Sequence, residues 1–259
     1  MSAKKTRDRR NFLRGGTLLG TLLLGGCDKF ADSETGQKIL GSASNVNRWV
    51  QRLVTSRKAL APEYTEADLS PMFRANGSDD PDTPEYNALV DSKFADFRLK
   101  IDGLVERPMA FSLAELRALP SRTQITRHDC VEGWSCIGKW TGVRLSALLE
   151  RAGLKADARY LVFHCADELE KTGDGSGLYY ESIDLDDAFH EQTILAYEMN
   201  DATLEIAHGA PLRLRVERQL GYKQAKYVMR IEAVDSFASL HGGKGGFWED
   251  RGYEWYAGI

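Results

Sequence analysis

The most unusual stretch of this 259-residue chain reads His128-Asp129-Cys130-Val131-Glu132-Gly133-Trp134-Ser135. Its cysteine stands between charged and aromatic residues, just before a glycine, whereas a free cysteine more often packs as a small apolar side chain. A thiolate here would be a soft ligand for a transition metal. The nearby cations Lys139, Arg127 and Arg144 could lower the pKa of the thiol. This stretch therefore carries the candidate chemistry, with a packing cysteine as the alternative.

Outward from this stretch, hydrophobic periodicity predicts a mixed α+β fold with a β-rich core and short helices. A strand at Gln124–Arg127 would deliver Cys130 at its far end. Further strands are expected at Phe97–Ile101, Tyr160–Phe163, Thr193–Met199, Leu212–Val216 and Tyr227–Ile231. One helix is expected to begin at Ser112, where the sequence has the pattern of a capping box. Three more helices are expected at Asn47–Leu60, Leu145–Gly153 and Leu185–His190.

The first 26 residues have the pattern of a secretory signal peptide, with a charged start and a short apolar run. The sequence Arg9-Arg10-Asn11-Phe12-Leu13 resembles a twin-arginine signal, which predicts export to the periplasm of a folded, cofactor-bearing protein. Leu24-Gly25-Gly26-Cys27 resembles a lipobox, so Cys27 could carry a lipid anchor to the inner membrane. A plain cleavage site beside an incidental cysteine is the alternative.

The charge of the remaining chain excludes one class of partner. Residues 1–26 hold six of the 34 basic side chains and one of the 38 acidic ones, which leaves an acidic excess of nine in the remainder. Because nucleic-acid binding needs clustered positive charge, we expect no nucleic-acid partner. The four cysteines form no Cys-x-x-Cys pair, so neither a thioredoxin-type site nor covalent haem is expected.

Three blocks in order resemble the sulfite oxidase fold of the oxidoreductase molybdopterin-binding family. They are Cys130–Ser135, the stretch from Trp140 to Leu149, and His208–Arg213 followed by Gly221-Tyr222-Lys223 and Lys226. The resemblance covers residues 94–237 and is strongest to stand-alone bacterial enzymes such as the catalytic subunit of periplasmic methionine-sulfoxide reductase. It implies four parts: the signal peptide at 1–26, a tether with a helix and an irregular segment at 27–93, the molybdopterin-binding domain at 94–240, and a Gly/aromatic tail at 241–259.

The resemblance implies a molybdenum–molybdopterin cofactor whose metal is bound by Cys130, the catalytic residue. Pterin contacts are implied for Asn76, Cys165, His208, Arg213, Gln224, Ala225 and Lys226. Arg213 and Lys226 suit this role because a buried phosphate needs fixed positive charge. Cys165 stands where the methionine-sulfoxide reductase group often has Thr, and His208 where it has Asn, while Asn76 is a loose match.

The resemblance also implies the reaction, a two-electron oxygen-atom transfer on a small-molecule or peptidyl sulfur or nitrogen oxide. Electrons would be exchanged with a separate protein, such as a haem-containing membrane subunit or a cytochrome, and the chain would act as a monomeric catalytic subunit. Sulfite oxidation stays open, because sulfite sites contain several arginines and Arg74, Arg127 and Arg218 could contribute to one.

A function of another class is a non-catalytic, exported lipoprotein that binds zinc or copper. Its mixed nitrogen and sulfur ligands would be His128, Cys130, Cys136, His164 and Cys165. A disulfide between Cys130 and Cys136 would instead abolish metal binding at Cys130. Metal analysis and release of a fluorescent pterin would distinguish these alternatives from the molybdenum enzyme.

Overall fold

A computed structural model describes residue 33, residue 46, residues 49–51 and residues 56–259. The chain divides into two units, residues 1–51 and 52–259, and the elements given below belong to the second. The expected signal peptide and Cys27 lie outside the described residues. Within the described residues, no helix has the length and apolar character that crossing a membrane requires.

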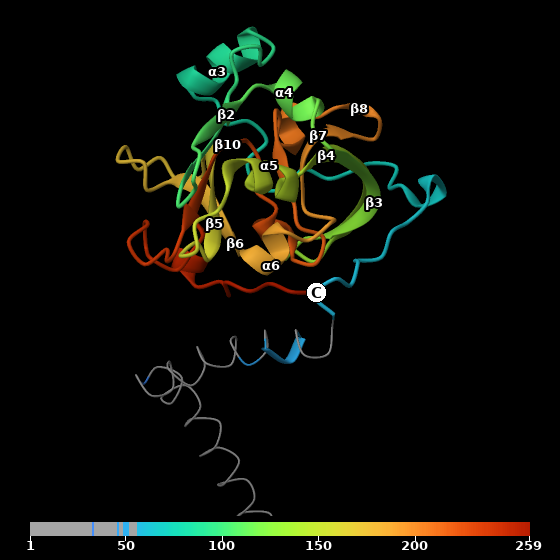
Figure 1. The fold of residues 1–259 in the computed structure, drawn as a ribbon. Coiled ribbons are helices and arrows are strands. Elements are labelled where there is room, and N and C mark those ends of the chain that lie inside the picture. The colour runs from blue at the N-terminus through green and yellow to red at the C-terminus, as the bar shows by residue number, and fades with distance from the viewer. Residues whose placement is uncertain (1–32, 34–45, 47–48, 52–55) are drawn as a thin grey trace, which may run out of the picture. The chain divides into compact units, whose positions relative to one another are not determined.

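One five-stranded sheet has the order β2, β1, β10, β5, β6 (Figure 1). The pair β1–β10 is parallel and the other neighbours are antiparallel. The strands span Met109–Phe111 (β2), Leu99–Gly103 (β1), Val228–Val234 (β10), Tyr160–Glu168 (β5) and Leu178–Asp184 (β6). This sheet contains three of the predicted strands, together with β2 and β6, which the sequence pattern did not reveal.

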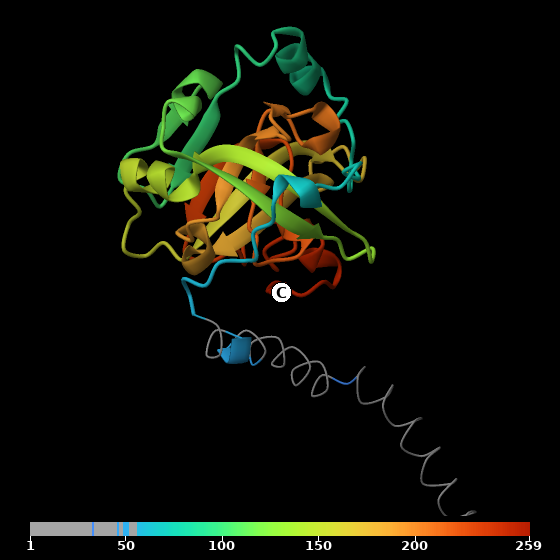
Figure 2. The ribbon, with the colours of Figure 1, turned by 90° about the vertical axis from the view of Figure 1, so that its right-hand side faces the viewer.

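The second sheet has the order β3, β4, β7, β8, and β9 also pairs with β7. Its strands span Ser121–Asp129 (β3), Ser135–Arg144 (β4), Ile194–Met199 (β7), Ala202–Thr203 (β8) and Arg213–Arg215 (β9). Strands β3 and β4 form a long, strongly curved antiparallel ribbon (Figure 2). The strand predicted to deliver Cys130 is confirmed, since β3 ends at the preceding residue.

Short helices connect the strands, as the sequence predicts. The α-helices span Pro84–Asp91 (α3), Leu113–Arg117 (α4), Leu145–Ala152 (α5) and Leu185–Ala188 (α6), and 3-10 turns span Glu66–Asp68 (η1), Ile206–His208 (η2), Gly221–Lys223 (η3) and Glu249–Arg251 (η4). The capping box at α4 is present, because the Ser112 hydroxyl accepts from Glu115 N while the Glu115 carboxylate accepts from Ser112 N. The mixed α+β class is therefore confirmed.

The main hydrophobic core lies between the two sheets and contains apolar side chains from both. Strand β7 shows how the sheets divide the interior: Leu195 and Tyr197 enter the main core, whereas Ile194 and Ala196 enter a smaller cluster with Trp140 and Phe73. Successive strand residues point to opposite faces, so β7 is buried on both. This explains the continuous apolar run that marks it in the sequence.

The helix predicted at Asn47–Leu60 is wrong at its C-terminal end. Val46 and residues 49–51 are helical, but residues 56–60 form a turn followed by extended chain. The reason is a tertiary contact: Gln192 accepts from Ala61 N at 2.8 Å and donates to Ala61 O at 3.1 Å. This side chain captures backbone groups that a continuing helix would have used.

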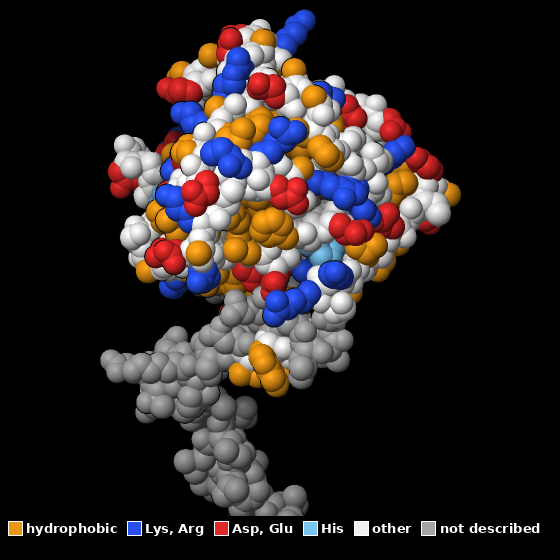
Figure 3. Space-filling model, viewed as in Figure 1, with side chains coloured by type: hydrophobic (Ala, Val, Ile, Leu, Met, Phe, Trp, Pro, Cys, Tyr) orange, Lys and Arg blue, Asp and Glu red, His pale blue; other side chains and the backbone are white. Residues whose placement is uncertain are grey.

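The surface carries both signs of charge. On the face shown in Figure 3, Lys and Arg side chains are interspersed with Asp and Glu side chains and do not gather into one patch. Ion pairs such as Arg117 with Glu198 and Arg230 with Asp102 contribute to this pattern.

Candidate active site

Cys130 lies in the hairpin that joins β3 to β4. Its backbone N–H donates to Trp134 O at 3.0 Å, and Gly133 N–H donates to Cys130 O at 3.0 Å. Gly133 adopts φ +85°, a region that residues with a Cβ rarely enter. The tight hairpin therefore fixes the half-buried Cys130 side chain at the edge of a cavity.

Six segments of the chain line this cavity. They are the loop at 76–78, the hairpin, the end of strand β5, strand β6, the stretch 221–226, and the C-terminal tail. The lining residues are Asn76, Gly77, Ser78, Cys130, Val131, Glu132, Asp167, Leu169, Tyr179, Gly221, Tyr222, Gln224, Lys226, Trp248 and Tyr253.

Two buried cations near the cavity have no carboxylate partner. Arg213 is fully buried and donates to the Asn76 side-chain oxygen at 2.9 Å and to His208 O at 3.2 Å. Lys226 is 5% exposed and donates to Ala207 O at 3.0 Å and to Ser78 O. Among residues 56–259, neither cation forms an ion pair. Since a buried charge is costly unless paired, this arrangement is suited to a bound anion.

The pKa values of these groups reflect the uncompensated charge. Burial is the main cause that lowers the pKa of Arg213 to about 9, and the charge of Arg215 is the second cause. Burial is likewise the main cause that lowers the pKa of Lys226 to about 7, and the charge of Arg213 is the second cause. Burial raises the pKa of Asp167 to about 7 although Lys226 opposes the shift. An anion bound beside the two cations would restore their charged forms.

Burial also raises the pKa of Cys130, and the Glu132 carboxylate adds to the increase, while Arg213 and Arg74 oppose it. The expectation that Lys139, Arg127 and Arg144 lower this pKa is wrong. Lys139 pairs with Glu66 and Asp201, and Arg127 pairs with Asp129, so both charges are compensated by other groups. Cys130 is therefore not activated by neighbouring cations, and a bound metal would remove its proton instead.

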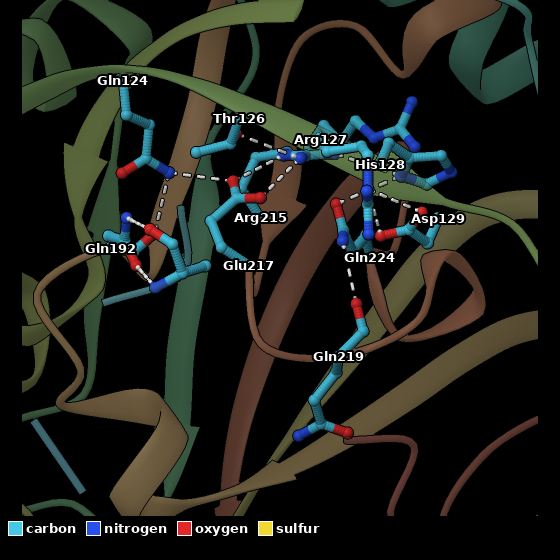
Figure 4. A network of polar contacts seen from close by, with 12 residues as sticks. Gln124, Thr126, Arg127, His128, Asp129, Gln192, Arg215, Glu217, Gln219 and Gln224 are labelled. Atoms are coloured by element: carbon cyan, nitrogen blue, oxygen red, sulfur yellow. Dashed lines mark hydrogen bonds and ion pairs between the residues drawn. The ribbon is translucent and has the colours of Figure 1, made fainter. Parts of the chain in front are cut away.

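A buried polar network supports the strand that carries Cys130 (Figure 4). Arg215 pairs with Glu217 at 2.6 Å, and its guanidinium lies 3.2 Å from His128 Nδ1. His128 also lies 3.4 Å from the Gln224 side-chain oxygen, which links the network to the cavity wall. Both members of the Arg215–Glu217 pair are fully buried and mutually compensated, unlike Arg213.

Gly221 is required where this network meets the cavity. A Cβ at Gly221 would lie 2.5 Å from the His128 ring atoms Cε1 and Nε2, a distance that side chains do not tolerate. The φ angle of Gly221 is not positive, so close approach is the reason for glycine here. The stretch 221–226 can therefore pack directly against the end of β3.

The structure brings most of the predicted site residues together. Cys130, Asn76, Gln224 and Lys226 line one cavity, and Arg213 reaches its wall by donating to Asn76. Arg213 is not solvated, because β9 is buried along its length. Ala225 is buried beside them, and its backbone oxygen accepts from Leu214 N at 2.8 Å.

The predicted residues Cys165 and His208 do not line this cavity. Cys165 lies on β5 opposite Val228 and belongs to the main hydrophobic core. His208 lines a different cavity with Met199 and Phe73, whose ring centroid is 5.7 Å from its own. The pterin contacts expected of these two side chains stay predictions, and the structure provides no direct cavity contact for either.

Several cavity residues are not among the predicted site residues, namely Glu132, Asp167, Tyr179, Trp248 and Tyr253. Asp167 follows Cys165 by two positions on β5, and its Oδ1 atom is buried without a hydrogen-bond partner. The signal that could have located Asp167 is a charged residue near the end of a strand that begins with an apolar run. Trp248 and Tyr253 gave no such signal, because only tertiary packing brings the tail to the cavity.

The zinc or copper site is contradicted. The proposed ligands were His128, Cys130, Cys136, His164 and Cys165, but the part of the chain that the structure describes contains no group of three His, Cys, Asp or Glu side chains placed to hold a metal. His164 instead pairs with Glu232 at 2.9 Å on β10. Cys130, Cys136 and Cys165 are all free thiols, so the alternative disulfide is absent as well.

Comparison with known proteins is consistent with this geometry. Residues 86–240 match the oxidoreductase molybdopterin binding domain. The chain belongs to this family. The family assignment makes it an enzyme, a molybdopterin-dependent oxidoreductase of the sulfite oxidase and sulfoxide reductase type, and the mixed α+β sheets are consistent with the fold of that type.

Relatives within the family include two proteins with informative names. The chain is 40% identical, over 96% of its length and 87% of the relative, to the Azospira oryzae protein named "Putative protein-methionine-sulfoxide reductase subunit YedZ1". It is 33% identical to the protein-methionine-sulfoxide reductase catalytic subunit MsrP of Ralstonia nicotianae, over 54% of this chain and 44% of that protein. The match therefore spans less than half the length of MsrP.

A solved structure with similarity to the chain is the sulfane dehydrogenase SoxCD from Paracoccus pantotrophus. The TM-score is 0.49 and the sequence identity is 27%, over 55% of this chain and 39% of that one.

Proposed function

We propose that this protein is an exported, molybdenum-cofactor-dependent reductase of sulfoxides, with peptidyl methionine sulfoxide as its substrate class. The observation that carries the proposal is the position of the Cys130 thiol on a cavity that the buried cation Lys226 also lines, while a second buried cation, Arg213, donates to the lining residue Asn76. The names of its relatives favour sulfoxide reduction within the family. The twin-arginine-like signal supports a periplasmic location, and Cys27 supports a lipid anchor.

The residues around the cavity fit a molybdopterin. Cys130 would bind the metal, and Arg213 and Lys226 would face the anionic part of the cofactor. Ser78 Oγ and Asp167 Oδ1 are buried without partners in the described chain, so both could meet polar atoms of a pterin. When bound, the cofactor supplies two-electron oxygen-atom transfer, and the protein holds it, orients it and excludes water.

The mouth of the cavity favours a neutral substrate over sulfite. No arginine is among the lining residues that the structure describes. Arg127 pairs with Asp129, Arg218 pairs with Asp187, and the Arg74 guanidinium lies 5.6 Å from the centroid of the Trp134 ring. The carboxylate of Glu132 is at the cavity instead and would repel a sulfite anion.

Reduction of a sulfoxide takes up two electrons and two protons and releases a thioether and water. The electrons would come from a separate redox protein, such as a haem-containing membrane subunit or a cytochrome, and the chain would act as the monomeric catalytic subunit. A reduced viologen dye can replace this partner in an assay. The sequence has no Cys-x-x-Cys-His motif for covalent haem, which supports an external electron source.

The experiment is a substrate panel with the purified, cofactor-loaded protein. With reduced viologen as donor, we expect turnover of N-acetylmethionine sulfoxide methyl ester and of an oxidised protein. With ferricyanide as acceptor, we expect no oxidation of sulfite. Sulfite oxidation without sulfoxide reduction would overturn the proposal. The Cys130→Ser variant is the control for activity at the site, and it should be inactive with every substrate.

A further inference from the structure

The cavity is completed by a segment beyond the matched family domain. The match ends at residue 240, yet Trp248 and Tyr253 of the C-terminal tail line the cavity together with Cys130. One wall of the site is therefore built from residues outside the matched domain.

A buried charge cluster fixes the tail against the domain. Lys223 donates to Glu249 of the tail at 2.6 Å and to Glu181 of β6, and all three side chains are at most 1% exposed. Backbone contacts add to this, since Phe247 N donates to Tyr180 O at 3.0 Å and Tyr222 Oη donates to Glu254 O at 2.7 Å. These contacts hold Trp248 and Tyr253 in place.

The tail rings form a continuous aromatic surface with the domain. The Tyr253 ring is edge-on to Tyr222 with centroids 5.3 Å apart, and it stacks on Trp248, also at 5.3 Å. Tyr253 is 41% exposed, whereas Arg213 and Lys226 are buried. The rings therefore stand at the outer end of the cavity, where a molecule arriving from solvent would meet them before it reached the cations.

We propose that Trp248 and Tyr253 are substrate-binding residues that hold the methyl–sulfur end of a methionine sulfoxide side chain. This inference rests on the proposed function and deepens it. A methionine thioether, which is the product, binds favourably against aromatic rings. The neutral sulfoxide substrate carries the same methyl group and needs no cation. The Lys223 ammonium, 6.0 Å from the centroid of the neighbouring Tyr222 ring, lies between two carboxylates and so attracts no anionic substrate.

The test measures binding and turnover of N-acetylmethionine sulfoxide methyl ester by the cofactor-loaded enzyme. Binding without a reductant is measured by calorimetry, and KM and kcat by viologen oxidation. Tyr253→Ala should weaken binding and raise KM about tenfold, the upper range of a sulfur–aromatic contact. Its kcat and molybdenum content should stay unchanged. Tyr253→Phe keeps the ring and should bind like the wild type.

A matched control is Phe189→Ala, which removes an aromatic ring of similar exposure, 45%, far along the chain from the tail. It should change neither binding nor KM. If the wild type reduces the sulfoxide and Tyr253→Ala binds it equally well, the inference is overturned while the proposed function stands. If the wild type reduces no sulfoxide, the proposed function fails and the inference fails with it.

Discussion

Two lysines three positions apart, Lys223 and Lys226, are both buried but have opposite electrostatic surroundings. Lys223 lies between Glu181 and Glu249; burial lowers its pKa, but the two carboxylates outweigh burial and raise it. Lys226 contacts backbone oxygens and has no carboxylate within ion-pair distance in residues 56–259, so burial lowers its pKa to about 7. The first lysine is structural, whereas the second is suited to an anionic ligand.

Replacing each lysine with methionine should separate these roles. In cofactor-free protein, Lys223→Met leaves two buried carboxylates unpaired and should lower the free energy of unfolding by about 3–5 kcal/mol. Lys226→Met removes an uncompensated charge and should cost no more than about 1 kcal/mol, for its lost hydrogen bonds. Lys226→Met should nevertheless reduce the amount of bound cofactor. Urea denaturation measures both effects, and equal losses of stability would contradict the assignment.

Asp167 gives the site a predictable pH dependence. Burial raises its pKa to about 7, so the folded protein keeps the proton from pH 4 to 7 while the unfolded chain loses it near pH 4. The stability that this group contributes is therefore fully present below pH 4 and is lost as the pH rises to 7.

Asparagine at position 167 cannot ionise, which isolates this effect. The measured quantity is the free energy of unfolding of Asp167→Asn minus that of the wild type, both in cofactor-free protein. This margin should increase by roughly 3–4 kcal/mol between pH 4 and pH 7, because only the wild type is destabilised over that range. Above pH 7 the margin should stay constant. Denaturant titrations at several pH values measure it, and a margin independent of pH would show that Asp167 ionises normally.

At the level of elements, the sequence predicts strands whose apolar pattern is local and misses those shaped by distant partners. Strand β4 was missed because Gly138 and Gly142 interrupt its pattern. Glycine is needed at position 142, since a Cβ there would lie 2.2 Å from Leu195 O, and a Cβ at Gly138 would make a tight 3.1 Å contact with the Phe73 ring. These close approaches are not visible in the pattern of a single strand.

Strand β6 was missed for a related reason. Its residues Glu181 and Ser182 are polar yet fully buried, so they break the apolar pattern expected of a buried strand. Their partners lie far along the chain: Ser182 Oγ donates to Gly245 O and accepts from Trp255 Nε1 of the tail at 2.8 Å, whereas Glu181 pairs with Lys223 of η3. Burial of Ser182 is possible because the tail satisfies its hydrogen bonds, and burial of Glu181 because Lys223 compensates its charge.

For the whole molecule, the sequence located the centre of the site better than its walls. Cys130, Lys226 and Gln224 were predicted from blocks of sequence that resemble the family. The fold places all three on one cavity. Asp167, Trp248 and Tyr253 were missed because their positions depend on how β5 and the tail pack. Cys165 matched a family position in sequence, but the fold directs it into the core.

The whole account depends on a bond between Cys130 and molybdenum carried by a pterin. The most direct measurement is the metal and pterin content of protein expressed with its signal peptide in a molybdate-supplied, export-competent host. We predict about one molybdenum per chain, with pterin, in the wild type and in Cys136→Ser, and neither metal nor pterin in Cys130→Ser. A wild-type protein without molybdenum, or a Cys130→Ser variant that retains it in full, would contradict the account.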